Sequence, residues 1–260
     1  MDFKRTLDIG TVLLHLLGLV TGFFTIFSSF AAEPERITIA HGEFKPFIWS
    51  EMGESKGIYV DITKEVVAKR MGLEVEFQHF PWPRAQSRVK HGKSDGFITL
   101  VTTERLLYTV VGVEPLVASE MGGFARFDHP QIDKMMYFRN KIQLKPFRLL
   151  TYYGDGDAAQ RFKGYDMDFG ASNLYYAIQK LLQRRGGVLI QTSEVTQYNL
   201  KELGLKEQII QLPSLDLGKL NYKLMISKKS PFVGRINEID QLLRELKLNG
   251  DLDKFKECYR

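Results

Sequence analysis

The chain has 260 residues, of which 44% are hydrophobic and 26% charged, and its formal net charge is +5. This composition excludes a disordered or fibrous chain and is typical of a globular protein that buries a substantial core. The mild positive charge either favours anionic ligands or only keeps the protein soluble. Because the sequence has no long Lys/Arg cluster, it predicts no nucleic-acid partner.

The N-terminus has the pattern of an export signal. Two basic residues precede an apolar run over residues 9–27, and small side chains at Ser29 and Ala31 stand where an export peptidase requires them. We therefore predict that residues 1–31 are a cleavable signal peptide and that the mature protein is periplasmic. The apolar run approaches the roughly 20 residues that span a bilayer, so an uncleaved membrane anchor is the alternative.

Strands and helices alternate in the first third of the chain. The strand segments alternate apolar and polar residues or are apolar throughout, and Asp61 and Gly72 suit the two ends of the first helix. The predicted elements are strands at 36–40, 73–77 and 96–101, and helices at 61–72 and 84–90.

A second series with the same rhythm follows an extended stretch over residues 116–127, in which we expect Gly122-Gly123 to separate two strands. Another extended stretch, 221–227, then leads to helical spacing of apolar residues from Val233 to Leu246. Such alternation predicts an α/β protein with mainly parallel sheets covered by helices, in two lobes. The second series consists of strands at 147–153, 188–192 and 208–213, and helices at 154–162, 172–187 and 194–204.

The chain shows none of the common signatures of metal or cofactor sites. Its histidines lack metal-ligand spacing, and the Asp155-Gly156-Asp157 turn lacks the rest of a calcium loop. Neither a Gly-rich nucleotide loop nor a Ser/His/Asp order is present. Cys258 is the only cysteine, so packing rather than a disulfide must stabilise the fold. We predict no metal and no cofactor.

Several motifs occur in a characteristic order: "FKPFIW", "GIYVDITKEVVAKRMG", "PWPRAQSRVKHGKSDGFI", "TTER", "EPLV" and "YKLMISKKSPFVGRINEIDQLLRELKLNGDLDKF". In this order they resemble the bacterial family 3 extracellular solute-binding proteins, from Arg36 to Tyr259. The resemblance implies the two-lobe type II periplasmic-binding-protein fold, with hinge strands at 122–127 and 221–227. Lobe 1 would comprise 32–123 and 222–260, and lobe 2 would comprise 124–221.

The resemblance also implies a function. Members capture a solute between the lobes and deliver it to an inner-membrane ABC permease, so we expect a monomer without enzymatic activity. The expected ligand is a small carboxylate-bearing solute, a polar amino acid or a derivative. Two alternatives stay open: an enzyme resembling cyclohexadienyl dehydratase, and a ligand module for a membrane sensor.

Two aromatic residues match the family positions that enclose the ligand. Phe44 precedes the Pro-Phe pair, where an aromatic ring stacks on the ligand, and Trp82 matches the ring on the opposite side. The prolines that flank Trp82 restrict the backbone, so the indole is held ready at low entropic cost. The alternative is that Trp82 belongs to the ordinary core.

Arg105, which closes the "TTER" motif, matches the arginine that binds the ligand carboxylate. A guanidinium grips a carboxylate through two parallel hydrogen bonds, and Thr99 and Thr102 would add hydroxyl groups beside it. The alternative is a surface ion pair between Arg105 and Glu104 or Glu120.

Two further segments match parts of the family site. Arg84, in "PWPRA", either faces the cleft or belongs to a solvated helix face. The "YYGDGDAAQ" segment fits the helix N-terminus that receives the carboxylate, where free N–H groups favour an anion, although Asp155 and Asp157 add negative charge and would serve equally as caps.

The clearest departure from the family concerns the aspartate that binds a ligand ammonium. Thr192 stands at that position, followed by Ser193 and Glu194. Either Glu194 takes over the role or the ligand has no amine. For the enzyme alternative, the candidates for a general acid or base are Glu194 and His41.

Overall fold

The structure is a computed structural model that describes residues 35–259, which belong to one compact unit. The predicted signal peptide, residues 1–31, lies outside the described residues. The strands are β1 (Arg36–His41), β2 (Trp49–Glu51), β3 (Glu54–Lys56), β4 (Glu74–His79), β5 (Gly96–Thr99), β6 (Thr109–Val111), β7 (Val117–Arg126), β8 (Leu149–Tyr152), β9 (Met167–Ala171), β10 (Val188–Thr192), β11 (Ile209–Gln211) and β12 (Lys219–Ser227). The α-helices are α2 (Ile58–Thr63), α3 (Trp82–Lys90), α4 (Thr103–Leu106), α5 (Ile132–Met135), α6 (Gly156–Arg161), α7 (Leu174–Leu182), α8 (Ser193–Glu202), α9 (Ile236–Leu248) and α10 (Asp251–Glu257). The remaining helical segments are the π-helix η1 (Lys64–Arg70) and the 3-10 helices η2 (Lys141–Leu144) and η3 (Pro231–Arg235).

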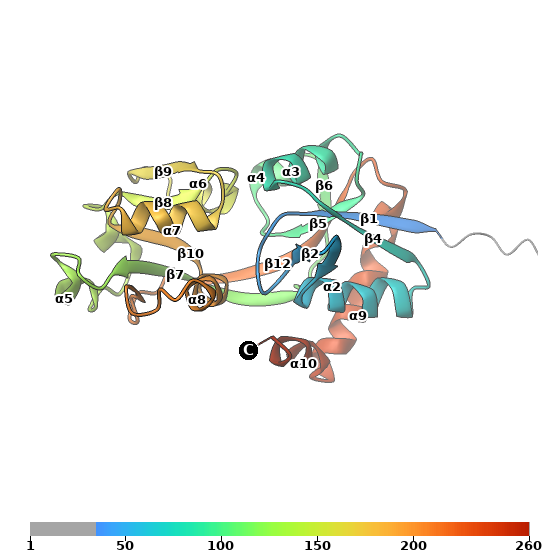
Figure 1. Ribbon diagram of the computed structural model, residues 1–260. Coiled ribbons are helices and arrows are strands. Elements are labelled where there is room, and N and C mark those ends of the chain that lie inside the picture. The colour runs from blue at the N-terminus through green and yellow to red at the C-terminus, as the bar shows by residue number, and fades with distance from the viewer. Residues whose placement is uncertain (1–34, 260) are drawn as a thin grey trace, which may run out of the picture. The chain divides into compact units, whose positions relative to one another are not determined.

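Each lobe is built on three parallel strands. In the first lobe β1 lies between β4 and β5, and in the second β8 lies between β10 and β9. The antiparallel strands β12 and β7 join the two sets in the order β4-β1-β5-β12-β7-β10-β8-β9. Figure 1 shows α2, α3 and α9 around the first set of strands and α6 and α7 around the second. The predicted α/β fold with two lobes is confirmed.

Two strands cross between the lobes. Residues 117–120 of β7 pair with 219–222 of β12, after which β7 continues along β10 and β12 along β5. In β7 the crossing therefore lies just before the predicted hinge stretch 122–127, and in β12 it overlaps the start of the predicted stretch 221–227.

The predicted break at Gly122-Gly123 is wrong, because β7 runs without interruption from Val117 to Arg126. A Cβ atom on Gly122 would lie 2.7 Å from the side chains of Phe124 and Ser193, and one on Gly123 would lie 2.7 Å from Leu215. The glycines therefore serve close packing inside a strand rather than a turn.

The first helical segment begins earlier than predicted. Asp61 is not its N-cap, because α2 starts at Ile58 after Gly57, whose φ of 119° favours glycine. A Cβ atom on Gly57 would also lie 2.5 Å from the Phe47 carbonyl oxygen. As a result Tyr59 lies in the first turn of α2, where it is fully buried.

In the second lobe α7 packs on the sheet through one apolar face. Its buried residues recur at helical spacing, and fully burying a side chain such as Ile178 stabilises the fold by about 1.5–3 kcal/mol. The side chain of Asn173 caps the helix by accepting a hydrogen bond from the Tyr176 N–H (3.2 Å). This packing fixes the loop before α7, which reaches the cavity described below. The buried residues of α7 are Leu174, Ala177, Ile178 and Leu181.

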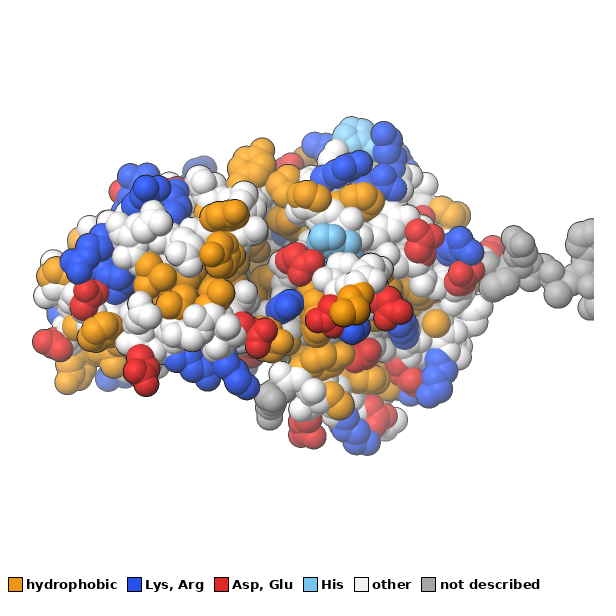
Figure 2. All heavy atoms as spheres, viewed as in Figure 1, with side chains coloured by type: hydrophobic (Ala, Val, Ile, Leu, Met, Phe, Trp, Pro, Cys, Tyr) orange, Lys and Arg blue, Asp and Glu red, His pale blue; other side chains and the backbone are white. Residues whose placement is uncertain are grey.

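Within residues 35–259, no helix combines the length and the hydrophobicity needed to cross a bilayer. On the face of the molecule shown in Figure 2, Lys and Arg side chains occur in several small groups with Asp and Glu among them. This face therefore carries no continuous basic stripe of the kind that follows a nucleic-acid backbone.

Candidate functional site

A cavity of about 420 Å³ is lined by residues of both lobes, a volume typical of small-molecule sites. The first lobe contributes the loop after β1 and parts of α2, α3, α4 and β5, and the second contributes the segments after β8 and β9 and the end of β10. Tyr222 of the crossing strand β12 also lines it. Several of the lining side chains are aromatic: Phe44, Tyr59, Phe80, Trp82, Tyr152 and Tyr222.

Arg105 brings a buried cation to this cavity. Its Nη1 donates to the Leu100 carbonyl oxygen (2.8 Å), and Nε and Nη2 both donate to Gln86 Oε1 (3.2 and 3.0 Å). The guanidinium carbon lies 5.4 Å from the centre of the Trp82 ring. Among the described residues Arg105 forms no ion pair, and neither Glu104 nor Glu120 approaches it as a partner. Burial lowers its pKa, an effect that Tyr108 and Asp155 oppose.

These three hydrogen bonds leave two of the five N–H groups of Arg105, and Tyr108 is a further side-chain hydrogen-bond neighbour of the guanidinium. The side chain is only 4% exposed, so an unpaired charge there is unfavourable until a carboxylate neutralises it. Thr102 holds the arginine indirectly, because its hydroxyl accepts the Arg105 backbone N–H at the start of α4 (3.3 Å). Thr102 does not line the cavity, whereas Thr99, at the end of β5, does.

The two predicted aromatic residues line the same cavity. Phe44 packs against Tyr222, with ring centres 5.6 Å apart, and Trp82 packs against Phe97 at 5.8 Å. Trp82 lies in the first turn of α3 rather than before it, and its indole remains partly accessible. Arg84 is exposed on α3, 5.2 Å from the Phe80 ring, and does not line the cavity.

The first lobe contacts the second directly beside the cavity. Trp82 Nε1 and Gln86 Nε2 both donate to the Gly154 carbonyl oxygen, at 3.0 and 3.3 Å. The Thr103 N–H donates to Gln160 Oε1 at 3.2 Å. Gln86 thus connects Arg105 to the second lobe, a role that no local pattern in the sequence indicates.

The turn before α6 lies opposite Arg105, since a Cβ atom on Gly156 would be 3.6 Å from Arg105 Nη2. Asp155 caps α6, accepting the Ala158 N–H (3.0 Å) and the Thr151 hydroxyl (2.6 Å). Both oxygens of Asp157 accept hydrogen bonds from Arg161. Asp155 therefore has the capping role that was the alternative at this turn, whereas Asp157 forms an ion pair with Arg161 that was not anticipated.

The region that replaces the ammonium site is closed. Thr192 is fully buried, and its hydroxyl is hydrogen-bonded to the Tyr222 phenol and donates to Gln191 Oε1 (3.0 Å). Glu194 accepts a short hydrogen bond from Ser119 and lines a second cavity of about 460 Å³, between α8 and α10. Neither residue lines the first cavity.

His41 does line the first cavity, with its ring nitrogens hydrogen-bonded to the Gly42 carbonyl (3.0 Å) and the Ser55 hydroxyl (2.7 Å). Burial lowers its pKa to about 4; the hydrogen bond to Gly42 opposes this decrease and the neighbouring His79 adds to it. The ring is therefore neutral at pH 7. Since His41 and Glu194 line different cavities, they form no acid–base pair. Among residues 35–259, no three His, Cys, Asp or Glu side chains are grouped to hold a metal ion.

Several cavity residues were not anticipated: Tyr59, Tyr152, Gln191 and Tyr222. Tyr152, Gln191 and Tyr222 fall within predicted elements and Tyr59 lies just before the predicted helix 61–72, but which side chains point to the cavity depends on how the lobes pack. Three of these residues are tyrosines, and burial raises the pKa of each phenol. Tyr152 raises the pKa of Tyr59 and Tyr222 further, whereas side-chain interactions with Gln191 and Thr192 oppose the rise at Tyr152 and Tyr222.

Comparison with known proteins gives a family and a fold. The model of the bacterial extracellular solute-binding proteins, family 3, matches residues 37–260. None of the curated proteins matches the chain in sequence.

Solved structures resemble this chain at low sequence identity and so share its fold. A histidine kinase sensor domain with similarity to periplasmic binding proteins superposes with a TM-score of 0.72 at 17% identity, covering 87% of this chain and 96% of its own. The arginine-, lysine-, histidine-binding protein ArtJ from Geobacillus stearothermophilus gives 0.68 at 17%, covering 86% and 95%. The GluR0 ligand-binding core from Nostoc punctiforme, in complex with L-glutamate, gives 0.65 at 20%, covering 86% and 98%.

Proposed function

Because the chain belongs to the bacterial extracellular solute-binding proteins, family 3, we propose that it captures a small carboxylate-bearing solute between its lobes and delivers it to an ABC importer. The solute class that we propose is a polar amino acid or a derivative. The structural neighbours named for amino-acid binding support this class. Export to the periplasm, by removal of residues 1–31, belongs to the same proposal.

The observation that carries the proposal is Arg105. Its guanidinium is buried at the cavity, lacks a carboxylate partner among the described residues and is held in place by Gln86 and Leu100. A ligand carboxylate would complete its hydrogen bonds and neutralise its charge. Phe44 and Trp82 would then enclose the body of the ligand, with Thr99 beside the carboxylate.

Lobe closure supplies the second part of the mechanism. The contacts from Trp82 and Gln86 to Gly154 span the two lobes. The same two side chains contact Arg105: the Trp82 ring stacks on its guanidinium, and Gln86 accepts its hydrogen bonds. A ligand bound at Arg105 would therefore stabilise the closed arrangement, which a permease can distinguish from the open one.

The test is ligand screening by thermal unfolding of the purified protein, with amino acids and amine-free carboxylates added singly. A ligand at 100 times its dissociation constant adds about 2.7 kcal/mol, which raises the melting temperature by about 5 to 10 °C for this length. Binding is then followed by fluorescence in the Trp49→Phe variant, because Trp82 becomes its only tryptophan.

Arg105→Ala is expected to weaken binding at least about 100-fold, because a buried charge-assisted pair is lost. Arg105→Lys keeps the charge without the bidentate geometry and is expected to recover only part of the affinity. Arg84→Ala is the matched control, since Arg84 is exposed on α3 outside the cavity. Full binding by Arg105→Ala would overturn the proposal.

The sensor domain among the structural neighbours favours a second candidate, a ligand module for a membrane sensor. Uptake of radiolabelled ligand by cells lacking the protein separates the two. Loss of uptake supports transport, whereas normal uptake with loss of a ligand-dependent transcriptional response supports sensing. Recovery of the ligand chemically unchanged after incubation tests the enzyme alternative.

A further inference from the structure

Two residues that line the cavity each carry a buried polar atom that makes no hydrogen bond of ordinary length and angle among residues 35–259. These atoms are Gln191 Nε2 and Tyr59 Oη, in side chains that are 5% and 1% exposed. The other two atoms of this kind belong to Trp49 and Thr63, which do not line the cavity. Folded proteins rarely leave such groups unpaired, so we looked for the ligand chemistry that would satisfy them.

The orientation of the Gln191 amide is fixed by its neighbour. Gln191 Oε1 accepts both the Thr192 backbone N–H (2.8 Å) and the Thr192 hydroxyl (3.0 Å). A flipped amide would set its NH₂ group against the backbone N–H, so the oxygen must face Thr192 and Nε2 must face away. Nε2 is a donor with no acceptor function, and therefore only an accepting group satisfies it.

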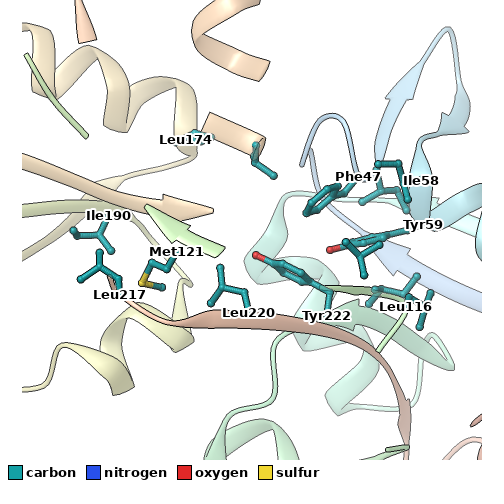
Figure 3. Close-up of a cluster of buried hydrophobic side chains, with 14 of the residues drawn as sticks. Phe47, Ile58, Tyr59, Leu116, Met121, Leu174, Ile190, Leu217, Leu220 and Tyr222 are labelled. Atoms are coloured by element: carbon teal, nitrogen blue, oxygen red, sulfur yellow. The ribbon is translucent and has the colours of Figure 1, made fainter. Parts of the chain in front are cut away.

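Tyr59 and Tyr222 form a contrasting pair at the same end of the cavity. Their ring centres are 5.8 Å apart, and Figure 3 shows both phenol oxygens pointing toward the side where Leu174 and Ile190 lie. The Tyr222 hydroxyl is paired with Thr192, whereas the Tyr59 hydroxyl is not paired. The Gln191 side chain also interacts with Tyr152, at a geometry poorer than that of an ordinary hydrogen bond, and this interaction partly offsets the rise that burial causes in the pKa of Tyr152.

The carboxylates that line the cavity are already engaged with protein groups. Asp155 caps α6, and Asp157 pairs with Arg161. Glu43 lies 3.0 Å from His79 and accepts the Ser50 N–H (3.1 Å). A ligand ammonium would therefore have to compete for the oxygens of Asp155 and Asp157, whereas Glu43 uses only Oε1 in its two contacts. Near Gln191 Nε2 an ammonium would meet a second donor.

We propose that Gln191 Nε2 and Tyr59 Oη form a subsite for a neutral hydrogen-bond-accepting group of the ligand, a hydroxyl or a carbonyl, and that this subsite excludes an ammonium. The inference deepens the proposed function and rests on it, because it takes a carboxylate at Arg105 as the other end of the ligand. The aromatic walls between the two ends fit a flat apolar body. The ligand class is thus a hydroxyaryl or oxoaryl carboxylate without an amine at this end.

The test uses three para-substituted acids that differ in a single group: 4-hydroxyphenylacetate, 4-methylphenylacetate and 4-(aminomethyl)phenylacetate. Their dissociation constants are measured by calorimetry on the purified protein. The hydroxyl and methyl groups are similar in size, so their difference isolates the hydrogen bonds, and the third acid adds a cation. We expect the hydroxyl compound to bind about five- to tenfold tighter than the methyl compound, and the ammonium compound to bind weakest.

Two variants assign the preference to the subsite. Tyr59→Phe removes only an unpaired hydroxyl and is expected to reduce the hydroxyl-over-methyl preference to about twofold or less. Gln191→Glu keeps the oxygen that accepts from Thr192 and replaces the donor by an acceptor, so the ammonium compound is expected to gain relative to the hydroxyl compound. Tyr222→Phe is the control, because its hydroxyl is already paired inside the protein.

The outcomes separate the subsite from the function on which it rests. Equal affinities for the three acids, tightest binding of the ammonium compound, or an unchanged preference in Tyr59→Phe and Gln191→Glu would overturn the subsite and leave carboxylate binding intact. An unchanged preference would mean that other groups of the cavity bind the hydroxyl, whereas equal affinities would mean that water satisfies Gln191 Nε2 and Tyr59 Oη. If no carboxylate binds and Arg105→Ala changes nothing, the proposed function fails and the subsite fails with it.

Discussion

The two lobes contribute different polar chemistry to one cavity. The first lobe contributes a cation, Arg105, which has no carboxylate partner among the described residues. Three of its five N–H groups donate to Gln86 and Leu100. The second lobe offers Asp155 and Asp157, whose oxygens already accept hydrogen bonds within their own lobe, and one neutral donor on Gln191. In the proposed site, the first lobe therefore supplies the charge that binds the carboxylate, while Gln191 of the second lobe and Tyr59 of the first bind the neutral polar group.

This contrast depends on His41, which lines the cavity in the first lobe as Arg105 does, adding no second buried positive charge. Burial lowers the pKa of His41 to about 4 from its usual 6.5. Between these values the unfolded chain binds more protons than the folded one, so stability must fall as the pH drops from about 6.5 to 4. His41 contributes up to about 3 kcal/mol to this loss.

The measurement is the free energy of unfolding in urea at a series of pH values. His41→Gln is expected to flatten the slope between pH 6.5 and 4, and His91→Gln, at an exposed position on the surface, is expected to leave it unchanged. An equal slope in both variants would mean that His41 is charged in the folded protein, and the contrast between the lobes would then need revision.

Tyr222 and Tyr59 are neighbouring phenols, one with a hydrogen-bond partner among the described residues and one without. Removing each hydroxyl tests whether the partner changes its contribution to the free energy of unfolding. Tyr222→Phe removes a hydrogen bond to Thr192 and is expected to lower the free energy of unfolding by about 1 kcal/mol. Tyr59→Phe removes a buried hydroxyl without a partner among the described residues, so it is expected to leave stability unchanged or raise it by about 1 kcal/mol. Urea unfolding of the ligand-free variants checks this, and equal losses in both would contradict it.

The sequence predicted the order of strands and helices well where each element carries its own pattern. The apolar strand β5 and the amphipathic helices α7 and α9 follow directly from residue spacing. The structure also places four of the predicted site residues at one cavity: Phe44, Trp82, Thr99 and Arg105.

Other features depended on contacts between distant segments, which a local pattern does not contain. In sequence, Gly122 resembles a turn residue, but it lies inside strand β7. A glycine is needed there because Phe124 and Ser193 leave no room for a side chain. Gln86 and Gln191 are ordinary polar residues in sequence, and their importance arises only where the two lobes meet. Thr192 was aligned with the family aspartate that binds the ligand ammonium. In the structure Thr192 is fully buried, and its hydroxyl is hydrogen-bonded to Tyr222.

The smallest expected effect concerns closure, where the chain's two tryptophans provide a matched pair. Trp82→Phe keeps an aromatic wall and removes the 3.0 Å hydrogen bond to the Gly154 carbonyl, which joins the lobes. Because this bond exists only when the lobes meet, its loss should weaken ligand binding several-fold, or about 1 kcal/mol, with little change in the stability of either lobe. Trp49→Phe is the control, since Trp49 Nε1 has no partner among residues 35–259 and lies outside the cavity. Equal calorimetric affinities for the two variants would mean that the indole contributes only its ring, and that closure rests on Gln86 and Thr103.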